Sequence, residues 1–154
     1  PRKAKEAIGA IAQLTHADGR KMVANVEYNQ LEPLLLATGH VEGDVNEADG
    51  FSKFPGNINE IVIHLPRYLE TLQLSGGKLD EFINPKYVDA ARTAFKSPTR
   101  LECMMQDYAK TVPPNHPVGW TRYPLEYGYF PCKNDLASAA KLSALGVPAH
   151  SAST

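Results

Sequence analysis

Three polar residues have types and positions that suit a binding site. Glu27 follows an alternating apolar run, so it lies at the carboxyl end of a predicted strand, where open α/β sheets bind ligands. Asn57 precedes a helical pattern, and Lys133 precedes a predicted helix N-terminus that could hold a phosphate. Each also has an ordinary interpretation: a solvent-facing strand residue, a helix N-cap paired with Glu60, and an exposed lysine. The local pattern leaves both alternatives open.

The motifs of common enzyme classes are absent from the sequence. No G-x-S-x-G, H-E-x-x-H, Walker or C-x-x-C pattern occurs, and Ser75–Lys78 follows a helical pattern, which favours a turn over a phosphate loop. The two cysteines, Cys103 and Cys132, have no metal-ligand spacing and are expected to be reduced thiols. The histidines are dispersed and no metal site is expected within the chain; they are His16, His40, His64, His116 and His150.

Length and charge restrict the function further. The 154 residues carry 16 Lys+Arg against 17 Asp+Glu, so no broad basic surface is available for nucleic acid or an anionic membrane. No apolar run approaches the roughly 20 residues of a membrane span, and no secretory leader follows the polar start, so we expect a cytosolic protein. The chain begins at Pro1 without an initiator methionine, which indicates a processed or excised piece of a longer protein.

In the first third of the chain, helical and extended patterns alternate. The spacing of apolar residues predicts a helix over residues 2–14, a tight turn at Asp18-Gly19 and an extended segment over residues 21–28. A short helix over residues 30–38 ends at Gly39, and an exposed loop follows over residues 40–54.

Alternation continues to the carboxyl end, which predicts an α/β fold. The strongest stripe runs from Ile58 to Leu72 and predicts helical structure that ends at Gly76-Gly77. Pro66 lies inside it, so we expect a kink, or two abutting helices, near residues 62–66. The remaining expectations are a strand over residues 81–84, a helix from Pro98 to Tyr108, an irregular segment over residues 112–117, strands over residues 118–121 and 126–130, a helix capped by Asn134 or Asp135 that reaches Leu145, and a disordered tail over residues 148–154.

Several long stretches closely resemble the UDP-sugar pyrophosphorylases. The similarity runs from the first residues to the His150-Ser151-Ala152 tail, and it is far more specific than a short motif. Its main stretches are residues 25–35 (NVEYNQLEPLL), 54–59 (FPGNIN), 81–87 (EFINPKY) and 95–108 (FKSPTRLECMMQDY).

The resemblance implies a uridylyltransferase. Members of this family use UTP and a sugar 1-phosphate to make a UDP-sugar and pyrophosphate, on a Rossmann-like, GT-A-like nucleotidyltransferase domain with a mixed sheet and flanking helices. Residues 1–147 would then form the second, C-terminal half of that catalytic domain. A UDP-N-acetylglucosamine pyrophosphorylase remains an alternative, but residues 95–108 match the broad-range family better.

The resemblance also implies roles for individual residues. Glu27 and Tyr28 match the family's V-E-Y element, whose glutamate accepts hydrogen bonds from sugar hydroxyls. Gly56 and Asn57 match its G-N-I element, whose asparagine donates to and accepts from the sugar. Lys133 matches, more loosely, a lysine that approaches the nucleotide phosphates and serves as the catalytic residue of this segment.

Two parts of the family's site have no counterpart in these residues. The glycine-rich loop that cradles UTP and the aspartate that holds magnesium would precede this region. We therefore expect a Mg²⁺ cofactor whose ligand lies outside the chain, a partner surface for the remainder of the same polypeptide, and no activity of the chain alone. Alternatives of other classes are a module that binds UDP-sugars without turnover and a fragment that only packs against its missing halves.

Overall fold

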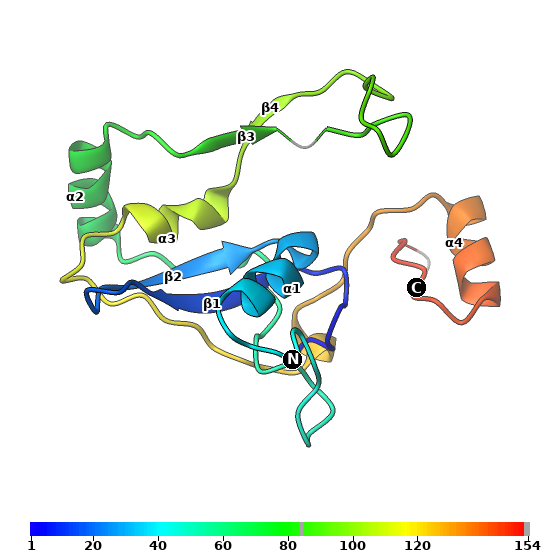
Figure 1. Ribbon diagram of the computed structural model, residues 1–154, viewed down its shortest axis with the longest axis horizontal. Helices are drawn as coiled ribbons and strands as arrows, with labels where there is room; N and C mark the ends of the chain where they lie inside the picture. Colours follow the sequence, from blue (N-terminus) through cyan, green and yellow to red (C-terminus); the bar gives the residue numbers. More distant parts are fainter. Residues whose placement is uncertain (84, 153–154) are drawn as a thin grey trace. The chain divides into compact units, whose positions relative to one another are not determined.

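A computed structural model describes residues 1–83 and 85–152. The chain divides into two units, residues 2–121 and residues 122–154 together with Pro1, and each is described by itself. Within the described residues the strands form two antiparallel pairs, β1 with β2 and β3 with β4 (Figure 1). The expectation of an α/β fold is therefore confirmed at the level of a mixed α/β chain.

The first unit is built on a β-hairpin. Strands β1 (Ala10–Thr15) and β2 (Lys21–Val26) pair antiparallel, and the turn between them is closed by the Gly19 N–H on the His16 carbonyl at 2.9 Å. The predicted turn and the extended segment are confirmed. The predicted helix over residues 2–14 is wrong, because the alternation in β1 is satisfied by pairing with β2.

One face of the hairpin forms the core of this unit. Small apolar side chains of β1 and β2 turn towards helix α1 (Tyr28–Ala37), which follows β2 and ends at Thr38 and Gly39, as predicted. The buried cluster consists of Ala10, Ala12, Val26, Leu31 and Leu35. The opposite face carries Asn25 and Glu27, which are half-buried.

A further extended segment borders β1 on its other edge. The Ile11 N–H donates to the Pro55 carbonyl at 2.9 Å, Ala10 and Gly56 form an antiparallel bridge, and the Asn57 N–H donates to the Gly9 carbonyl at 2.8 Å. The start of β1 therefore lies between β2 and residues 55–57, although residues 55–57 belong to no named strand.

Helix α2 (Leu65–Ser75) begins later than the apolar stripe predicts. Residues 57–64 are not helical, and Pro66 lies in the first turn of α2, where its missing N–H costs no intrahelical bond. The predicted helix start at Ile58 and the kink at Pro66 are therefore wrong. The helix ends at Gly76 in the left-handed conformation with φ of 63°, as the glycine pair predicts.

Short elements complete the first unit. Strand β3 (Glu81–Ile83) confirms the predicted extended segment there, and the fourth residue of that prediction, Asn84, lies outside the described residues. Strand β4 (Leu101–Cys103) pairs with β3, so the helix predicted from Pro98 is wrong at that point. Helical structure begins only with the 3₁₀ helix η1 (Met105–Asp107) and helix α3 (Tyr108–Thr111). Residues 112–117 are irregular, as predicted.

The second unit contains the 3₁₀ helix η2 (Leu125–Tyr127) and helix α4 (Leu136–Ala144). No strand forms at residues 118–121 or 126–130, so both strand predictions are wrong. The predicted final helix is confirmed, with Asp135 as its N-cap accepting from the Ser138 N–H at 2.9 Å. In the predicted tail, Ala149 and Ser151 are buried and the His150 carbonyl accepts from Lys133 and Asn134, whereas residues 153 and 154 lie outside the described residues.

Candidate functional site

Glu27 lies at the junction of β2 and α1, as its place after the alternating run predicts. Its backbone carbonyl accepts from the N–H groups of Gln30 and Leu31 at 2.8 and 3.0 Å, which starts the helix. Its side chain makes no capping hydrogen bond, although Glu27 is the N-cap residue. Instead, Oε1 accepts from Nδ2 of Asn25 at 2.8 Å. A carboxylate offers about four lone-pair sites, so this one bond leaves acceptor capacity for a ligand.

Asn57 does not start a helix, so its interpretation as an N-cap is wrong. Its Nδ2 donates to Oδ1 of Asn25 at 3.0 Å, and its Oδ1 accepts from the Asn59 N–H at 2.9 Å. The side chain is half-buried. A primary amide carries two donor hydrogens and two acceptor lone pairs, and these two bonds use one of each. The remaining donor and acceptor suit a ligand with hydroxyl groups.

The structure brings Glu27 and Asn57 together across the start of β1. Ala10 pairs with Val26 on one side and with Gly56 on the other, so the preceding residue, Gly9, lies level with Glu27 and Asn57. Both side chains bond to Asn25. We call Glu27, Asn25 and Asn57 the polar row. No sequence pattern indicates this arrangement, since it depends on pairing between segments far apart in the chain.

Of the residues next to Asn57 and Glu27, Gly56 is closely packed and Tyr28 is exposed. Gly56 passes close to the N-terminal segment, and a Cβ on it would lie 3.2 Å from Cγ2 of Ile8 and 3.4 Å from Cβ of Arg2. A glycine at this position therefore permits close packing. Tyr28 is the first residue of α1 and its side chain is 49% exposed, so it is available for a contact beside Glu27.

Lys133 lies in the second unit and is exposed. Its N–H donates to the His150 carbonyl at 2.7 Å, and it stands two positions before Asp135, the N-cap of α4. The position just before a helix N-terminus is thus confirmed. Its role towards phosphate stays a prediction.

The interior of the first unit holds an ion pair that sequence reasoning missed. Arg2 is fully buried, and its Nη2 lies 2.9 and 2.8 Å from the two carboxylate oxygens of Asp44. The hydroxyl of Ser52 donates to Asp44 at 2.7 Å, and Nε of Arg2 donates to the Phe54 carbonyl at 3.2 Å. The segment that leads to the polar row is therefore anchored inside the unit. The prediction that residues 40–54 are an exposed loop is wrong at Asp44 and Ser52.

Hydrogen bonding sets the charge state of Asp44. Burial acts to raise the pKa of this carboxyl, but hydrogen bonds from the Lys5 N–H, Ser52 and Arg2, with the positive charge of Arg2, hold it below its ordinary value of 3.8. Asp44 is therefore ionised at neutral pH. No local signal in the sequence marks the pair, because its partners are 42 residues apart.

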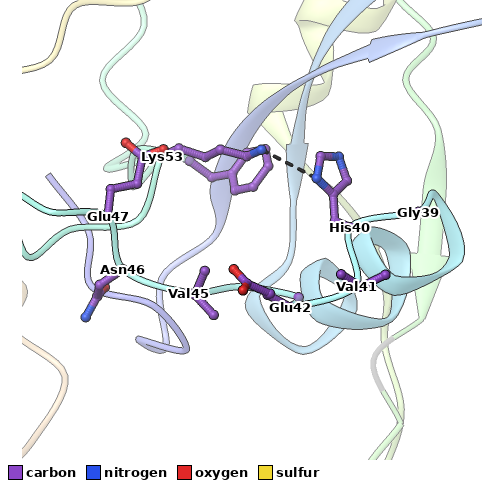
Figure 2. Close-up of a pocket in the computed structure, with 10 residues that line it drawn as sticks. Gly39, His40, Val41, Glu42, Val45, Asn46, Glu47 and Lys53 are labelled. Atoms are coloured by element: carbon purple, nitrogen blue, oxygen red, sulfur yellow. Dashed lines mark hydrogen bonds between the residues drawn. The ribbon is translucent and has the colours of Figure 1, made fainter.

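A separate pocket of about 440 Å³ opens beside the loop that follows α1 (Figure 2). Both His40 and Lys53 line it, and in Figure 2 a dashed line joins the two side chains, with Nζ of Lys53 3.5 Å from Nδ1 of His40. Lys53 also lies over the ring of Phe54, 5.1 Å from its centroid. Glu27 and Asn57 do not line this pocket, so it is distinct from the polar row.

Neither a metal cluster nor a membrane segment is found in the described residues. Over residues 1–83 and 85–152, no group of three or more His, Cys, Asp or Glu side chains could hold a metal ion. In the same ranges, no helix is both long and apolar enough to cross a membrane.

The fold and the polar row define a mixed α/β protein that presents a carboxylate and a carboxamide side by side, a combination suited to a hydroxyl-rich ligand. Over all 154 residues the chain is 58% identical to a UDP-sugar pyrophosphorylase of Arabidopsis thaliana. It is 57% and 56% identical over the same length to UDP-sugar pyrophosphorylases of Oryza sativa subsp. indica and subsp. japonica. The resemblance to the UDP-sugar pyrophosphorylases is therefore confirmed along the whole chain.

The match covers the relatives only in part. The chain spans 25% of the length of each of these three relatives. No family model matches the chain.

Proposed function

We propose that the chain is the sugar-binding part of a cytosolic enzyme that transfers uridylyl from UTP to a sugar 1-phosphate, giving a UDP-sugar and pyrophosphate. The observation that carries this proposal is the polar row, in which Glu27 and Asn57 lie on one half-exposed face and both bond to Asn25. The identity of 58% to a UDP-sugar pyrophosphorylase along the whole chain supports the substrate class.

In this proposal the two side chains divide the recognition of the sugar. The Glu27 carboxylate accepts charge-assisted hydrogen bonds from two neighbouring hydroxyls. The Asn57 amide donates with its second Nδ2 hydrogen and accepts with the second lone pair of Oδ1. Gly56 lets the backbone beside Asn57 pack closely against the N-terminal segment, and Tyr28 contributes a contact to the sugar beside Glu27. Once the sugar covers them, polar partners of this kind discriminate against analogues that lack a hydroxyl, because a partner left without its hydrogen bond costs free energy.

The proposed chemistry requires no general base. A sugar 1-phosphate oxygen is already anionic, and it attacks the α-phosphorus of UTP as the bond to the leaving pyrophosphate breaks. The barrier lies in bringing two polyanions together. Lys133 supplies positive charge near the phosphates. Mg²⁺, when bound, would neutralise phosphate charge, and the proposal places its ligand in the rest of the polypeptide, as the family resemblance implies.

The proposal predicts activity for the complete polypeptide that contains this segment and none for the chain alone. The experiment incubates each with UTP, glucose 1-phosphate and Mg²⁺ and measures pyrophosphate. Release by the complete polypeptide only is the expected result. Turnover by the isolated chain contradicts the division of the site, and failure of the complete polypeptide contradicts the function.

A UDP-sugar-binding module without turnover is the second candidate. It is favoured by the fact that the hydrogen bonds within the polar row, and those that the backbone makes to it, come from residues 9–59. Titration calorimetry of the isolated chain with UDP-glucose separates the two. Submicromolar binding supports a binding module, whereas binding that requires the complete polypeptide supports the enzyme.

A further inference from the structure

We propose that Asn25 is a positioning residue for the sugar, and that Gly9 provides the space in which it works. Neither residue is expected to touch the substrate. The inference rests on the proposed function, since it concerns how Glu27 and Asn57 are held ready for the same ligand.

Two hydrogen bonds fix the orientation of the Asn25 amide. Its Nδ2 donates to Oε1 of Glu27 at 2.8 Å, and its Oδ1 accepts from Nδ2 of Asn57 at 3.0 Å. A carboxylate only accepts, so the Asn25 nitrogen must face Glu27. Its oxygen must then face Asn57, which turns the nitrogen of Asn57 inward and sets the direction of its second hydrogen.

Because Gly9 has no side chain, it leaves space beside the strand for the Asn25 amide. Asn25 in β2 and Glu27, the extended residue that follows β2, lie on the same face because side chains alternate along an extended chain. Gly9 lies level with Glu27 and Asn57, and a Cβ on it would lie 2.6 Å from Oδ1 and 3.2 Å from Nδ2 of Asn25. The Asn25 amide therefore occupies the place where a side chain of residue 9 would stand.

Residue 9 must be a glycine because a side chain there would collide with the Asn25 amide, and not because of its backbone φ angle. Gly9 is not among the glycines with positive φ, so an alanine fits its backbone conformation. Any side chain there must displace the amide of Asn25, because carbon–oxygen contacts of that length do not occur. Gly9→Ala and Asn25→Ala should consequently produce the same defect by different means.

The expected defect is specific to the sugar. Without Asn25, the Glu27 carboxylate loses its side-chain partner and Asn57 keeps only its bond from the Asn59 N–H. The substrate must then bear part of the entropy cost of ordering both side chains. In the complete polypeptide, Asn25→Ala and Gly9→Ala should each raise KM for glucose 1-phosphate about tenfold, on the order expected for one hydrogen bond to a charged group. KM for UTP should stay within about twofold, because nothing in the row is assigned to the nucleotide.

Gly119→Ala is the matched control, because its added Cβ has no atom within 4 Å and its φ is not positive. It should leave both KM values and the thermal midpoint unchanged. A variant whose midpoint falls while both KM values rise together has a general folding defect, and that result overturns the positioning role. Unchanged KM for glucose 1-phosphate in Gly9→Ala or Asn25→Ala overturns it as well.

The two proposals fail in different ways. A complete wild-type polypeptide without turnover contradicts the proposed function, and the row is then judged from crystal structures of the wild type and Gly9→Ala. The inference expects Asn25 to bond to Glu27 and Asn57 in the wild type and to be displaced in Gly9→Ala. An Asn25 side chain that contacts neither residue in the wild type overturns the inference independently of activity.

Discussion

The guanidinium of Arg2 and the carboxylate of Asp44 form a buried ion pair in which one nitrogen, Nη2, lies 2.9 and 2.8 Å from the two carboxylate oxygens. Arg2 is 0% and Asp44 3% exposed, so neither charge is solvated by water. Removing one partner leaves the other charge buried without compensation. The pair therefore ties the N-terminal segment to the loop that leads to Asn57.

Asp44→Ala should destabilise the chain by about 3–5 kcal/mol, because Arg2 keeps its charge in the interior. The measurement is the free energy of unfolding in urea. Glu32→Ala is the control, since Glu32 pairs with Lys5 at 3.2 Å near the surface, where solvent screens the pair. A urea midpoint that changes equally in the two variants contradicts the structural role of the buried pair.

The contribution of Asp44 should disappear in acid. Its pKa in the folded chain lies below the ordinary value of 3.8, so the stabilisation is fully present above that value and is lost as the pH falls through the folded pKa. The difference in unfolding free energy between wild type and Asp44→Ala should stay constant from neutral pH to about pH 4 and shrink below it. A difference independent of pH down to about pH 2 would show that folding leaves the pKa of Asp44 at its ordinary value, which contradicts the stabilising bonds to its carboxylate.

A glycine in the left-handed conformation ends helix α2. Gly76 ends this helix with φ of 63°, and a Cβ on it would meet no atom within 4 Å. Gly76→Ala should therefore cost about 1 kcal/mol through backbone strain alone. Gly119→Ala, without the positive φ, should cost less. Equal urea midpoints for the two variants would contradict the left-handed end of α2.

The sequence predicted the elements whose determinants are local. Asp18-Gly19 closes the hairpin, Gly39 and Gly76 follow the ends of α1 and α2, and Asp135 caps α4. In each case one or two residues fix the backbone conformation, so neighbouring segments are not needed to decide it.

Local periodicity failed where tertiary pairing decides. The apolar residues of β1 fit both a helical and an alternating spacing, and its pairing with β2 and with residues 55–57 selects the strand. Between Ile58 and Leu65 the apolar residues have helical spacing, but no helix forms. Helix α2 starts only at Leu65, where Pro66 suits the first turn. The resemblance supplied Glu27 and Asn57, but their connection through Asn25 and the buried Arg2–Asp44 pair required the fold.

Asn25→Asp gives the polar row a pH dependence. The substituted carboxylate keeps an acceptor towards Asn57 but loses the donor towards Glu27, and two adjacent carboxylates share a proton only in acid. The measured quantity is the ratio of KM for glucose 1-phosphate in a variant of the complete polypeptide to KM in the wild type. At about pH 8 this ratio should be higher for Asn25→Asp than for Asn25→Ala, and the ratio for Asn25→Asp should fall as the pH is lowered to about 5.5. A ratio that does not vary with pH contradicts a direct contact between residue 25 and Glu27.

The central claim is that Glu27 and Asn57 hold the sugar, and a crystal structure of the complete polypeptide with UDP-glucose tests it most directly. The predicted result is that Oε atoms of Glu27 and the side-chain amide of Asn57 lie within about 3.2 Å of sugar hydroxyl oxygens, with Asn25 between them and out of contact with the ligand. A sugar bound with its hydroxyls away from both side chains contradicts the claim.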